Sequence, residues 1–361
     1  MPFDPDKPYN DLPLLPPKTE LETKAVLKKT IAANKALAEL KGAGDLIPNQ
    51  GVLINAIVLQ EAKLSSEIEN VVTTNDELYR AFADAGHNTN PHTKEVLHYS
   101  EALWHGCDTL RNKGGPLTTN LFVSLFQIVK QTTDGIRKGA GTKLANPATG
   151  RIIYTPPEGE GLLRDKLANL EKFIYAEDEI DPLIKLAVLH YQFEAIHPFA
   201  DGNGRTGRIL NILFLIDRDL LDIPVLYLSR YIIENKNGYY VALRRVTEKQ
   251  AWEDWTVYML NAVEQTARAT RERIVAIKDL MNKTAETVRK KAPRIYSKDL
   301  IEVIFHQPYC KIKFLEDAEI GNRQTASTYL RELEKIGVLH GTKKGREFYY
   351  INKKFLDVLV K

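Results

Sequence analysis

Apolar residues recur at helical spacing along most of this chain. Val26, Ala33, Leu37 and Leu40 draw one stripe that ends before the Gly-Ala-Gly break at 42–44. A second helix is expected after Pro48. Two further stripes are Leu121, Leu125 and Ile128, and Leu163, Leu167, Leu170 and Ile174. These signals are dense from about 93 to 260 and predict a helical bundle.

Proline and glycine mark the segments that interrupt the helical pattern. The first seventeen residues hold six of the seventeen prolines, which predicts an extended arm that wraps the body. Residues 146–150 have turn chemistry, and the β-prone run 151–155 follows them, so we expect a small hairpin there. Asp181 and Pro182 have the pattern of a helix start, and that helix should run to about Ile196.

The last seventy residues have a different pattern. The charged stretch 283–293 indicates a junction, and Ser297 then begins a short helix. A second helix is expected over 311–319, Gly321 turns the chain, and Ala326, Leu330 and Leu333 stripe a third. Segment 341–346 lies between two β-prone runs. Helix, helix, helix, hairpin is the winged-helix order. We therefore divide the chain into an N-terminal region 1–92, a helical core with a helical junction 93–291, and an α+β winged-helix domain 292–361.

Composition narrows the class of protein. The 361 residues are 43% hydrophobic and 27% charged, which excludes disorder as the main state, and a net charge of +3 is too small for a protein that coats nucleic acid. Cys107 and Cys310 predict neither a disulfide framework nor a zinc site. No apolar run is long enough to cross a membrane, and the N-terminus does not resemble a signal peptide. We expect a cytoplasmic protein with no membrane partner.

Phosphate chemistry is indicated by residues 197–208, which read His-Pro-Phe-Ala-Asp-Gly-Asn-Gly-Arg-Thr-Gly-Arg. Gly202 and Gly204 allow a tight turn that exposes backbone N–H groups at a helix start, and such a start binds anions. Arg205 and Arg208 are three residues apart on the following helix, so both guanidinium groups could reach the same polyphosphate.

Two more residues of this segment fit the same chemistry. Asp201 can hold a divalent cation that bridges phosphate oxygens, as is usual for Mg²⁺. His197, at the end of the preceding helix, can act as a base at neutral pH. Each feature alone is common in structural roles, but their occurrence together within twelve residues favours a functional site.

The pattern His-Pro-Phe-x-Asp-Gly-Asn-Gly-Arg-x-x-Arg is the signature of Fic proteins, and this chain resembles that family at every specified position from His197 to Arg208. The helical run before the motif and the hairpin near 151–155 also look like the Fic core. The resemblance implies a mainly α fold, a Fic-type bundle with a hairpin flap. It also implies transfer of AMP from ATP to a Tyr, Thr or Ser hydroxyl of a target protein.

The resemblance assigns roles to individual residues. His197 removes the hydroxyl proton, and Asp201 binds Mg²⁺ across the α and β phosphates. The residues expected to bind ATP are Gly202, Asn203, Gly204, Arg205, Thr206, Gly207, Arg208 and Tyr240. The hairpin is the flap that pairs with a target segment by strand addition. Tyr240 lies where the family places an aromatic near adenine, although Tyr239 and Tyr240 could serve only in packing. His190 and Glu194 are expected to support the helix and loop.

A built-in restraint is implied by residues 65–70, Ser-Ser-Glu-Ile-Glu-Asn, which match the inhibitory-helix pattern of Fic proteins. In that interpretation Ser65 and Glu69 are inhibitory, and Glu69 pairs with Arg208 where the γ-phosphate of ATP would lie. The structural alternative is a capping box of Ser66 and Glu69 at the start of a helix.

The C-terminal seventy residues carry thirteen Lys or Arg against nine Asp or Glu. Plausible DNA contacts are Arg323, Gln324, Ser327, Thr328 and Arg331 on the third helix, and Lys343, Lys344 and Arg346 in the wing. Two other functions therefore stay open: a Fic enzyme that mainly removes AMP or transfers another phosphate-containing group, and a DNA-binding regulator with a secondary Fic core. The family resemblance also implies self-modification, and a homodimer is a further possibility.

Overall fold

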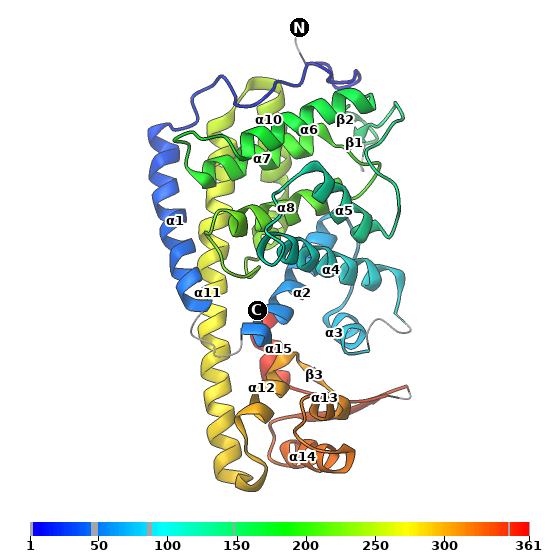
Figure 1. Cartoon of the computed structure of the whole chain (residues 1–361), viewed down its shortest axis with the longest axis vertical. Coiled ribbons are helices and arrows are strands. Elements are labelled where there is room, and N and C mark those ends of the chain that lie inside the picture. The colour runs from blue at the N-terminus through cyan, green and yellow to red at the C-terminus, as the bar shows by residue number, and fades with distance from the viewer. Residues whose placement is uncertain (1–2, 45–49, 85–88, 147–148, 346, 361) are drawn as a thin grey trace.

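The structure is a computed structural model that describes residues 3–44, 50–84, 89–146, 149–345 and 347–360, and helices dominate it (Figure 1). The first helices are α1 (Lys24–Gly44), α2 (Gln50–Ile68), α3 (Asn75–Ala83), α4 (Pro91–Arg111) and α5 (Thr119–Lys130). After the hairpin come α6 (Glu160–Ile174), α7 (Pro182–Ile196), α8 (Asn203–Asp217), α9 (Leu228–Glu234), α10 (Lys236–Lys249) and α11 (Trp252–Lys291). The prediction of a mainly α protein is confirmed.

Helices α7 and α8 form the centre of the bundle, because both are buried on almost every face. α6 and α11 pack against α7, whereas α4 and α5 pack against α8. The Asp181 carboxylate accepts a hydrogen bond from Leu183 N at 2.8 Å, and Pro182 begins the helix. The predicted bounds of α7 are confirmed.

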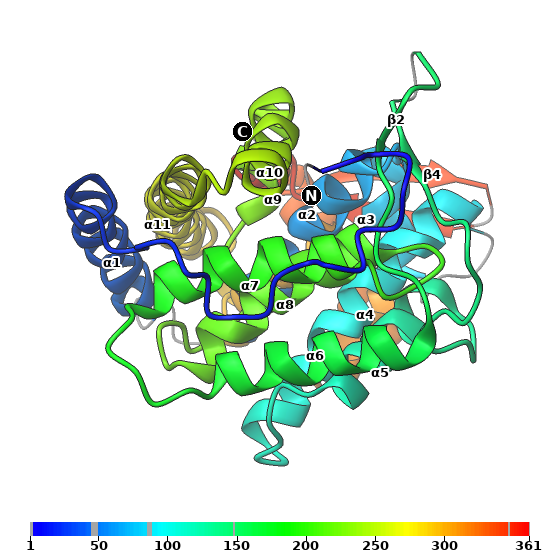
Figure 2. The same ribbon diagram turned by 90° about the horizontal axis from the view of Figure 1, so that it is seen from above.

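The N-terminal arm crosses α6 and α7 as an extended segment, which confirms the prediction (Figure 2). Its backbone is held by side chains of those helices. Lys166 Nζ donates to Leu12 O at 2.7 Å, and Asn169 exchanges hydrogen bonds of 2.8 and 3.0 Å with the backbone of Leu15. Gln192 donates to the carbonyl of Pro13 in the same way, at 2.9 Å.

The expected hairpin consists of β1 (Leu144–Ala145) and β2 (Ile152–Tyr154), which pair antiparallel with Leu144 opposite Tyr154. Residues 147 and 148 of its turn lie outside the described residues. The arm lies beside the hairpin, since Tyr9 N donates to Thr155 O at 3.0 Å (Figure 2).

Helix α11 is 40 residues long and includes most of the stretch 283–293 that was expected to be a junction. The helix continues to Lys291 because no proline or glycine interrupts it before Pro293, and because Val288 is buried like the rest of its apolar stripe. The chain breaks only at a 3-10 turn, Pro293–Ile295. Glycines 42 and 44 likewise stay within α1. Within the described ranges, no helix combines the length and apolarity needed to span a bilayer.

The C-terminal elements follow the predicted winged-helix order. They are α12 (Lys298–His306), β3 (Tyr309–Cys310), α13 (Ile312–Asp317), α14 (Arg323–Lys335), β4 (His340–Lys344), β5 (Glu347–Ile351) and α15 (Lys353–Val360). Ser297 caps α12 by accepting from Leu300 N at 3.0 Å. Strand β3, which pairs with β5 in the order β3-β5-β4, and helix α15 were not anticipated. We refer to residues 293–360 as the C-terminal module.

The C-terminal module contacts the N-terminal helices directly (Figure 1). Helices α12 and α15 pack against α2, and polar groups of the module reach α3. Tyr309 donates to Asp76 at 2.7 Å, and Asp84 accepts from Tyr349 at 2.5 Å and from Lys311 at 2.9 Å. The module is therefore joined to the helix that carries Ser65 and ends immediately before Glu69.

Candidate active site

The predicted site lies where α7 ends and α8 begins. His197 follows α7 in the left-handed conformation, φ 49° and ψ 59°, and its N–H donates to Phe193 O at 3.0 Å. Gly202, with φ 76°, precedes α8, and here a side chain would be strained. The left-handed residues at both ends reverse the chain, so the imidazole of His197 and the first turn of α8 face the same side.

Buried polar groups fix the loop between the two helices. The side chain of Asn203 accepts from Phe199 N and donates to Phe199 O, both at 2.8 Å. The hydroxyl of Thr206 donates to Gly202 O at 3.0 Å. Both residues are buried, so their contacts in this structure are with the loop. Gly207 lets α8 approach α7, because a Cβ there would lie 2.7 Å from Glu194 Oε1.

A cavity of about 580 Å³ opens in front of this loop. Its lining comes from the end of α2, from α7, α8 and α10, and from the hairpin. Among the lining residues are Glu69, Ile153, Glu194, His197, Gly204, Arg208, Tyr240 and Arg244. The structure thus brings five predicted site residues to one cavity: His197, Gly204, Arg208, Glu69 and Tyr240.

Arg208 is almost completely buried and is bonded to the end of α2. Its Nε donates to Ser65 Oγ at 2.8 Å, and its Nη2 donates to Ser65 O at 2.9 Å and to Glu69 Oε1 at 3.0 Å. Lys236 of α10 donates to Ile68 O at 2.7 Å and so holds the same helix end. The predicted pairing of Glu69 with Arg208 is present.

The capping-box alternative for Ser66 and Glu69 is wrong. Helix α2 ends at Ile68, and Asn70 follows with φ 62°, so this segment finishes a helix rather than starting one. A capping box does occur nearby, at the start of α3. There the Thr74 hydroxyl accepts from Glu77 N at 3.1 Å, and Glu77 Oε2 accepts from Thr74 N at 3.1 Å.

Arg205 points away from Arg208. Its Nη1 lies 2.6 Å from Glu95 Oε2 on α4, and its side chain is only 3% exposed. The expected convergence of the two arginines is therefore not seen here, because Glu95 and Glu69 draw them to different neighbours. Asp201 lies on the same side as Arg205, 4.0 Å from its guanidinium. Lys130 lies 2.7 Å from the Asp201 carboxylate, and the Asp201 side chain is 67% exposed.

A Mg²⁺ site built only from protein groups is not present in the described part of the chain, where no three His, Cys, Asp or Glu residues gather for a metal ion. Asp201 nevertheless fits the residue expected to hold Mg²⁺. Mg²⁺ in nucleotide sites takes one or two carboxylates and completes its octahedron with phosphate and water oxygens.

The two adjacent tyrosines of α10 have different environments. Tyr239 is buried, and its hydroxyl lies 2.8 Å from His190 Nε2. His190 also lies 3.1 Å from the side-chain amide of Asn211, so it supports the packing of α7, α8 and α10 as expected. Tyr240 is 43% exposed and lines the cavity. Both tyrosines line the cavity, but Tyr239 is held in the packing by its bond to His190, whereas Tyr240 is the one exposed to a ligand.

Burial changes the pKa of two cavity residues in opposite directions. Burial and the nearby Arg137 lower the pKa of His197 to about 4, so its imidazole is neutral at pH 7. Burial raises the pKa of Glu194 to about 7, against the opposing effect of Arg208. A neutral imidazole can accept a proton, and a neutral Glu194 can donate one.

Sequence reasoning missed two residues of this site. Arg137 donates from Nε to His197 O at 2.8 Å and also reaches Pro157 O, so it ties the loop to the chain after the hairpin. Glu194 was expected only as a support, yet it lines the cavity, and its buried Oε1 has no hydrogen-bond partner among the described residues. Its place one turn before His197 could have indicated this; nothing local marks Arg137.

Three family models match the chain. The model described as Fic/DOC family N-terminal matches residues 27–108, and the one described as Fic/DOC family matches residues 116–215. The model described as Protein adenylyltransferase SoFic-like, C-terminal domain, matches residues 280–355. The matched segments include α2, the loop from His197 to Gly202, and most of the C-terminal module.

Curated relatives match a shorter part of the chain. A probable protein adenylyltransferase of Aquifex aeolicus is 40% identical over 95 residues, 26% of this chain and 27% of that protein. A protein adenylyltransferase Fic of Culex quinquefasciatus is 30% identical over 118 residues, 32% of this chain and 23% of that protein. The matches thus span about a quarter of the length of these relatives.

Solved structures resemble the whole fold. A Fic family protein of Desulfovibrio desulfuricans G20 aligns with a TM-score of 0.58 and 18% identity, covering 93% of this chain and 98% of that one. A Fic domain containing signaling protein of Bacteroides thetaiotaomicron aligns with a TM-score of 0.54 and 17% identity, over 69% and 97% of the two chains. The solved structures thus share the fold, and the matches to the Fic/DOC models over residues 27–108 and 116–215 identify this chain as a member of the Fic/DOC family.

Proposed function

We propose that this protein transfers AMP from ATP to the hydroxyl of a Tyr, Thr or Ser side chain in a target protein. The observation that carries the proposal is one cavity that holds a neutral imidazole, His197, the first turn of α8 at Gly204, and the guanidinium of Arg208. A base, a helix start and a buried cation are what phosphoryl-group transfer needs. The relatives named protein adenylyltransferase support the same reaction.

The transfer exchanges one phosphorus–oxygen bond for another. The target hydroxyl oxygen bonds to the α-phosphorus of ATP, the bond from that phosphorus to the β-phosphate oxygen breaks, and pyrophosphate leaves. His197 accepts the hydroxyl proton. N–H groups at the start of α8 stabilise negative charge on the phosphates. Asp201 would hold Mg²⁺, which supplies positive charge to the phosphate oxygens.

Adenine and the target segment would use the remaining lining of the cavity. Tyr240, exposed at the cavity wall, offers a ring face to adenine. Strand β2 would accept an extended target segment by main-chain pairing, which brings a hydroxyl toward His197.

Glu69 restrains the reaction in this proposal. Its carboxylate is bonded to Arg208 and lies against the backbone of Gly204, where a Cβ would overlap it. The γ-phosphate of ATP needs the same guanidinium and the same helix start. A resting enzyme with Glu69 in place should bind ATP weakly or hold it in an unreactive pose.

Intact-mass spectrometry of the purified full chain tests the function. Wild type, Glu69→Gly and Glu69→Gly with His197→Ala are incubated with ATP and Mg²⁺. Added AMP that appears mainly on Glu69→Gly, little on wild type and not on the double variant supports self-modification, transfer and restraint together. A base typically contributes about 10² to 10⁴ in rate, so equal labelling of both variants would contradict the role of His197.

Removal of AMP is a second candidate activity for the same cavity. The side chain of Glu69 is 38% exposed, so its carboxylate can also contact a water molecule in the cavity. AMP-modified Glu69→Gly protein is mixed with wild type in the absence of ATP. Loss of the AMP mass with wild type, and its retention with a second portion of Glu69→Gly, would favour this activity.

DNA binding by the C-terminal module is supported by exposed polar residues on α14 and the wing. These are Arg323, Gln324, Thr328 and Arg331, with Lys343 and Lys344 in β4, whereas Ser327 is half-buried and Arg346 lies outside the described residues. Duplex binding should weaken steeply with salt and fall when both wing lysines are changed to alanine. Unchanged affinity in that variant would contradict a DNA-binding wing.

A further inference from the structure

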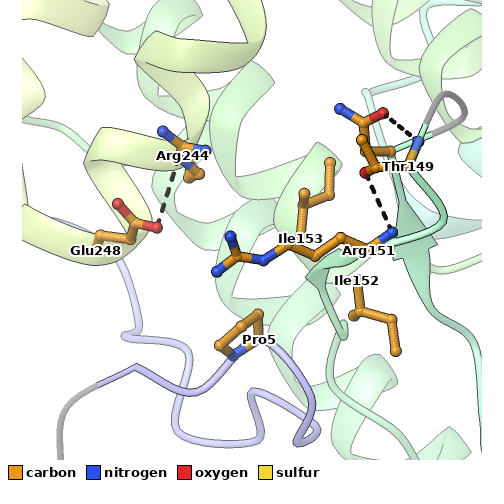
Figure 3. A pocket seen from close by; sticks show the side chains of 8 residues that line it. Pro5, Thr149, Arg151, Ile152, Ile153, Arg244 and Glu248 are labelled. Carbon is orange, nitrogen blue, oxygen red and sulfur yellow. Dashed lines mark hydrogen bonds and ion pairs between the residues drawn. The ribbon is translucent and has the colours of Figure 1, made fainter.

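A second, smaller cavity lies beside the hairpin and adjoins the cavity described above (Figure 3). Its volume is about 300 Å³. Pro5 of the arm forms one wall, residues 151–153 of the hairpin form another, and Arg244 and Glu248 of α10 form the third. The cavity therefore lies between three segments that are far apart in the sequence.

Arg151 gives this cavity an uncompensated positive charge. Its side chain extends into the space between α10 and the arm (Figure 3), and its guanidinium has no ion-pair or hydrogen-bond partner within the described ranges. Arg244 also faces the cavity, but its Nε lies 3.6 Å from Glu248 Oε1. Two guanidinium groups thus face one carboxylate, and Arg151 keeps all its donors for a ligand.

The small cavity continues from the catalytic cavity along the hairpin. Asn146, Ile153 and Arg244 line both of them. A segment paired with β2 rises by about 3.3 Å per residue, so a side chain two residues from the acceptor lies about 7 Å from it. A target segment whose hydroxyl reaches His197 therefore passes the mouth of the small cavity.

We propose that the small cavity is a subsite that selects an acidic side chain, Asp or Glu, close to the modified hydroxyl of the target. The proposal rests on the proposed transfer function. Arg151 binds the carboxylate through two parallel N–H donors, the arrangement in which arginine is most selective. Arg244 adds a charge that Glu248 partly offsets. A lysine or arginine at the same target position meets two like charges instead.

Synthetic peptides test the subsite, with the full-length Glu69→Gly protein as the enzyme. Each peptide has one central Tyr, Thr or Ser, and a single neighbouring position is varied between Glu, Gln and Lys at offsets up to four residues on either side. Binding is measured without ATP by fluorescence anisotropy, and transfer is measured with labelled ATP and Mg²⁺. The same peptides are offered to the added variant Arg151→Glu, and to Lys172→Glu, which makes the same charge change at an exposed position on α6.

At one offset Glu should be preferred over Lys by roughly fivefold, the ratio typical of a partly exposed charge pair. Arg151→Glu should reverse that preference, while Lys172→Glu should keep it. The effect should appear in peptide affinity and in KM rather than in kcat, because Arg151 does not reach the reacting atoms.

The two measurements separate the subsite from the transfer function. Transfer without any charge preference overturns the subsite and leaves the proposed function standing. Peptide binding that prefers Glu and is reversed by Arg151→Glu supports the subsite even if no peptide receives AMP, and that result would overturn the transfer function alone. Binding that ignores the varied charge, or a preference equally altered by Lys172→Glu, overturns the subsite.

Discussion

The Nη2 atom of Arg208 lies 3.0 Å from a carboxylate oxygen of Glu69, and the two side chains differ sharply in exposure. Arg208 is 1% exposed, whereas Glu69 is 38% exposed. The guanidinium keeps its two bonds to Ser65 without Glu69, but its charge is then uncompensated. An anion that arrives through the cavity can take the place of the carboxylate without unfolding the end of α2.

Glu69→Gly should therefore lower the stability of the free protein and raise its affinity for ATP. The free protein should melt at a lower temperature, because a buried arginine loses its acidic partner. ATP should bind at least tenfold more tightly than to wild type, which calorimetric titration can measure. Glu67→Gly is the matched control, since Glu67 pairs with Lys63 instead. Equal ATP affinity for wild type and Glu69→Gly would contradict the restraint.

AMP transfer by the Glu69→Gly variant should persist at mildly acidic pH. The base must be neutral to accept a proton, and burial with Arg137 lowers the pKa of His197 to about 4. The imidazole is then active throughout pH 5 to 8, so kcat/KM should show no loss centred near pH 6.5. If kcat/KM falls near pH 7 and this fall disappears in the Glu194→Gln variant, the titrating group is the Glu194 carboxyl. A fall of kcat/KM near pH 6.5 that persists in this variant would contradict the lowered pKa of His197.

Folding stability should fall as the pH rises through neutrality. Burial raises the pKa of Glu194 from 4.5 to about 7, so the folded state binds this proton more tightly than the unfolded state does. The contribution is complete below pH 4.5 and is lost as the pH rises through 7. Its size is on the order of 1 to 3 kcal/mol. Glu194→Gln should reduce the difference between urea unfolding free energies at pH 5 and pH 8; an unaltered difference would contradict the shift.

Gly106 lets α4 lie close to α8. A Cβ at this position would overlap the methyl groups of Leu213, whose side chain is fully buried and must change its packing to make room. Gly106→Ala should therefore lower stability, since overpacking costs about 1 to 3 kcal/mol and helix propensity returns about 1. Gly42→Ala, in α1 with open space around its Cβ, is the control and should lose nothing. Equal stability of the two variants would show that the contact relaxes.

Local sequence predicted the parts of the site that are local in space. The motif from His197 to Arg208 lies on one turn and one helix start, so spacing indicated the tight turn and the start of α8, although the convergence of Arg205 and Arg208 that it also suggested is not seen. The partners of its arginines are distant: Glu95 is 110 residues from Arg205, and Glu69 is 139 residues from Arg208. The Glu69 pairing was predicted only through family resemblance, and Glu95 was not predicted at all. Charge alone does not identify which of 47 acids an arginine meets.

The end of α11 was harder to predict, for a related reason. Its charged sequence resembles a linker because lysine and arginine are common in both, whereas Thr284 and Val288 are buried and hold this part of the helix against its neighbours. The winged-helix order was easier to predict, since each of its helices has its own apolar stripe and Gly321 separates two of them.

The contacts of α2 link the two ends of the chain into one cooperative unit. One side of α2 packs against α4 and α9, and α12 and α15 cover another. Asp76 and Asp84 add polar bonds to the same junction. Calorimetry should accordingly record a single melting transition rather than a separate, earlier one for the C-terminal module. If the C-terminal module or the remainder of the chain were expressed alone, the apolar helix faces at their contact would be exposed to water. Each part alone should therefore aggregate.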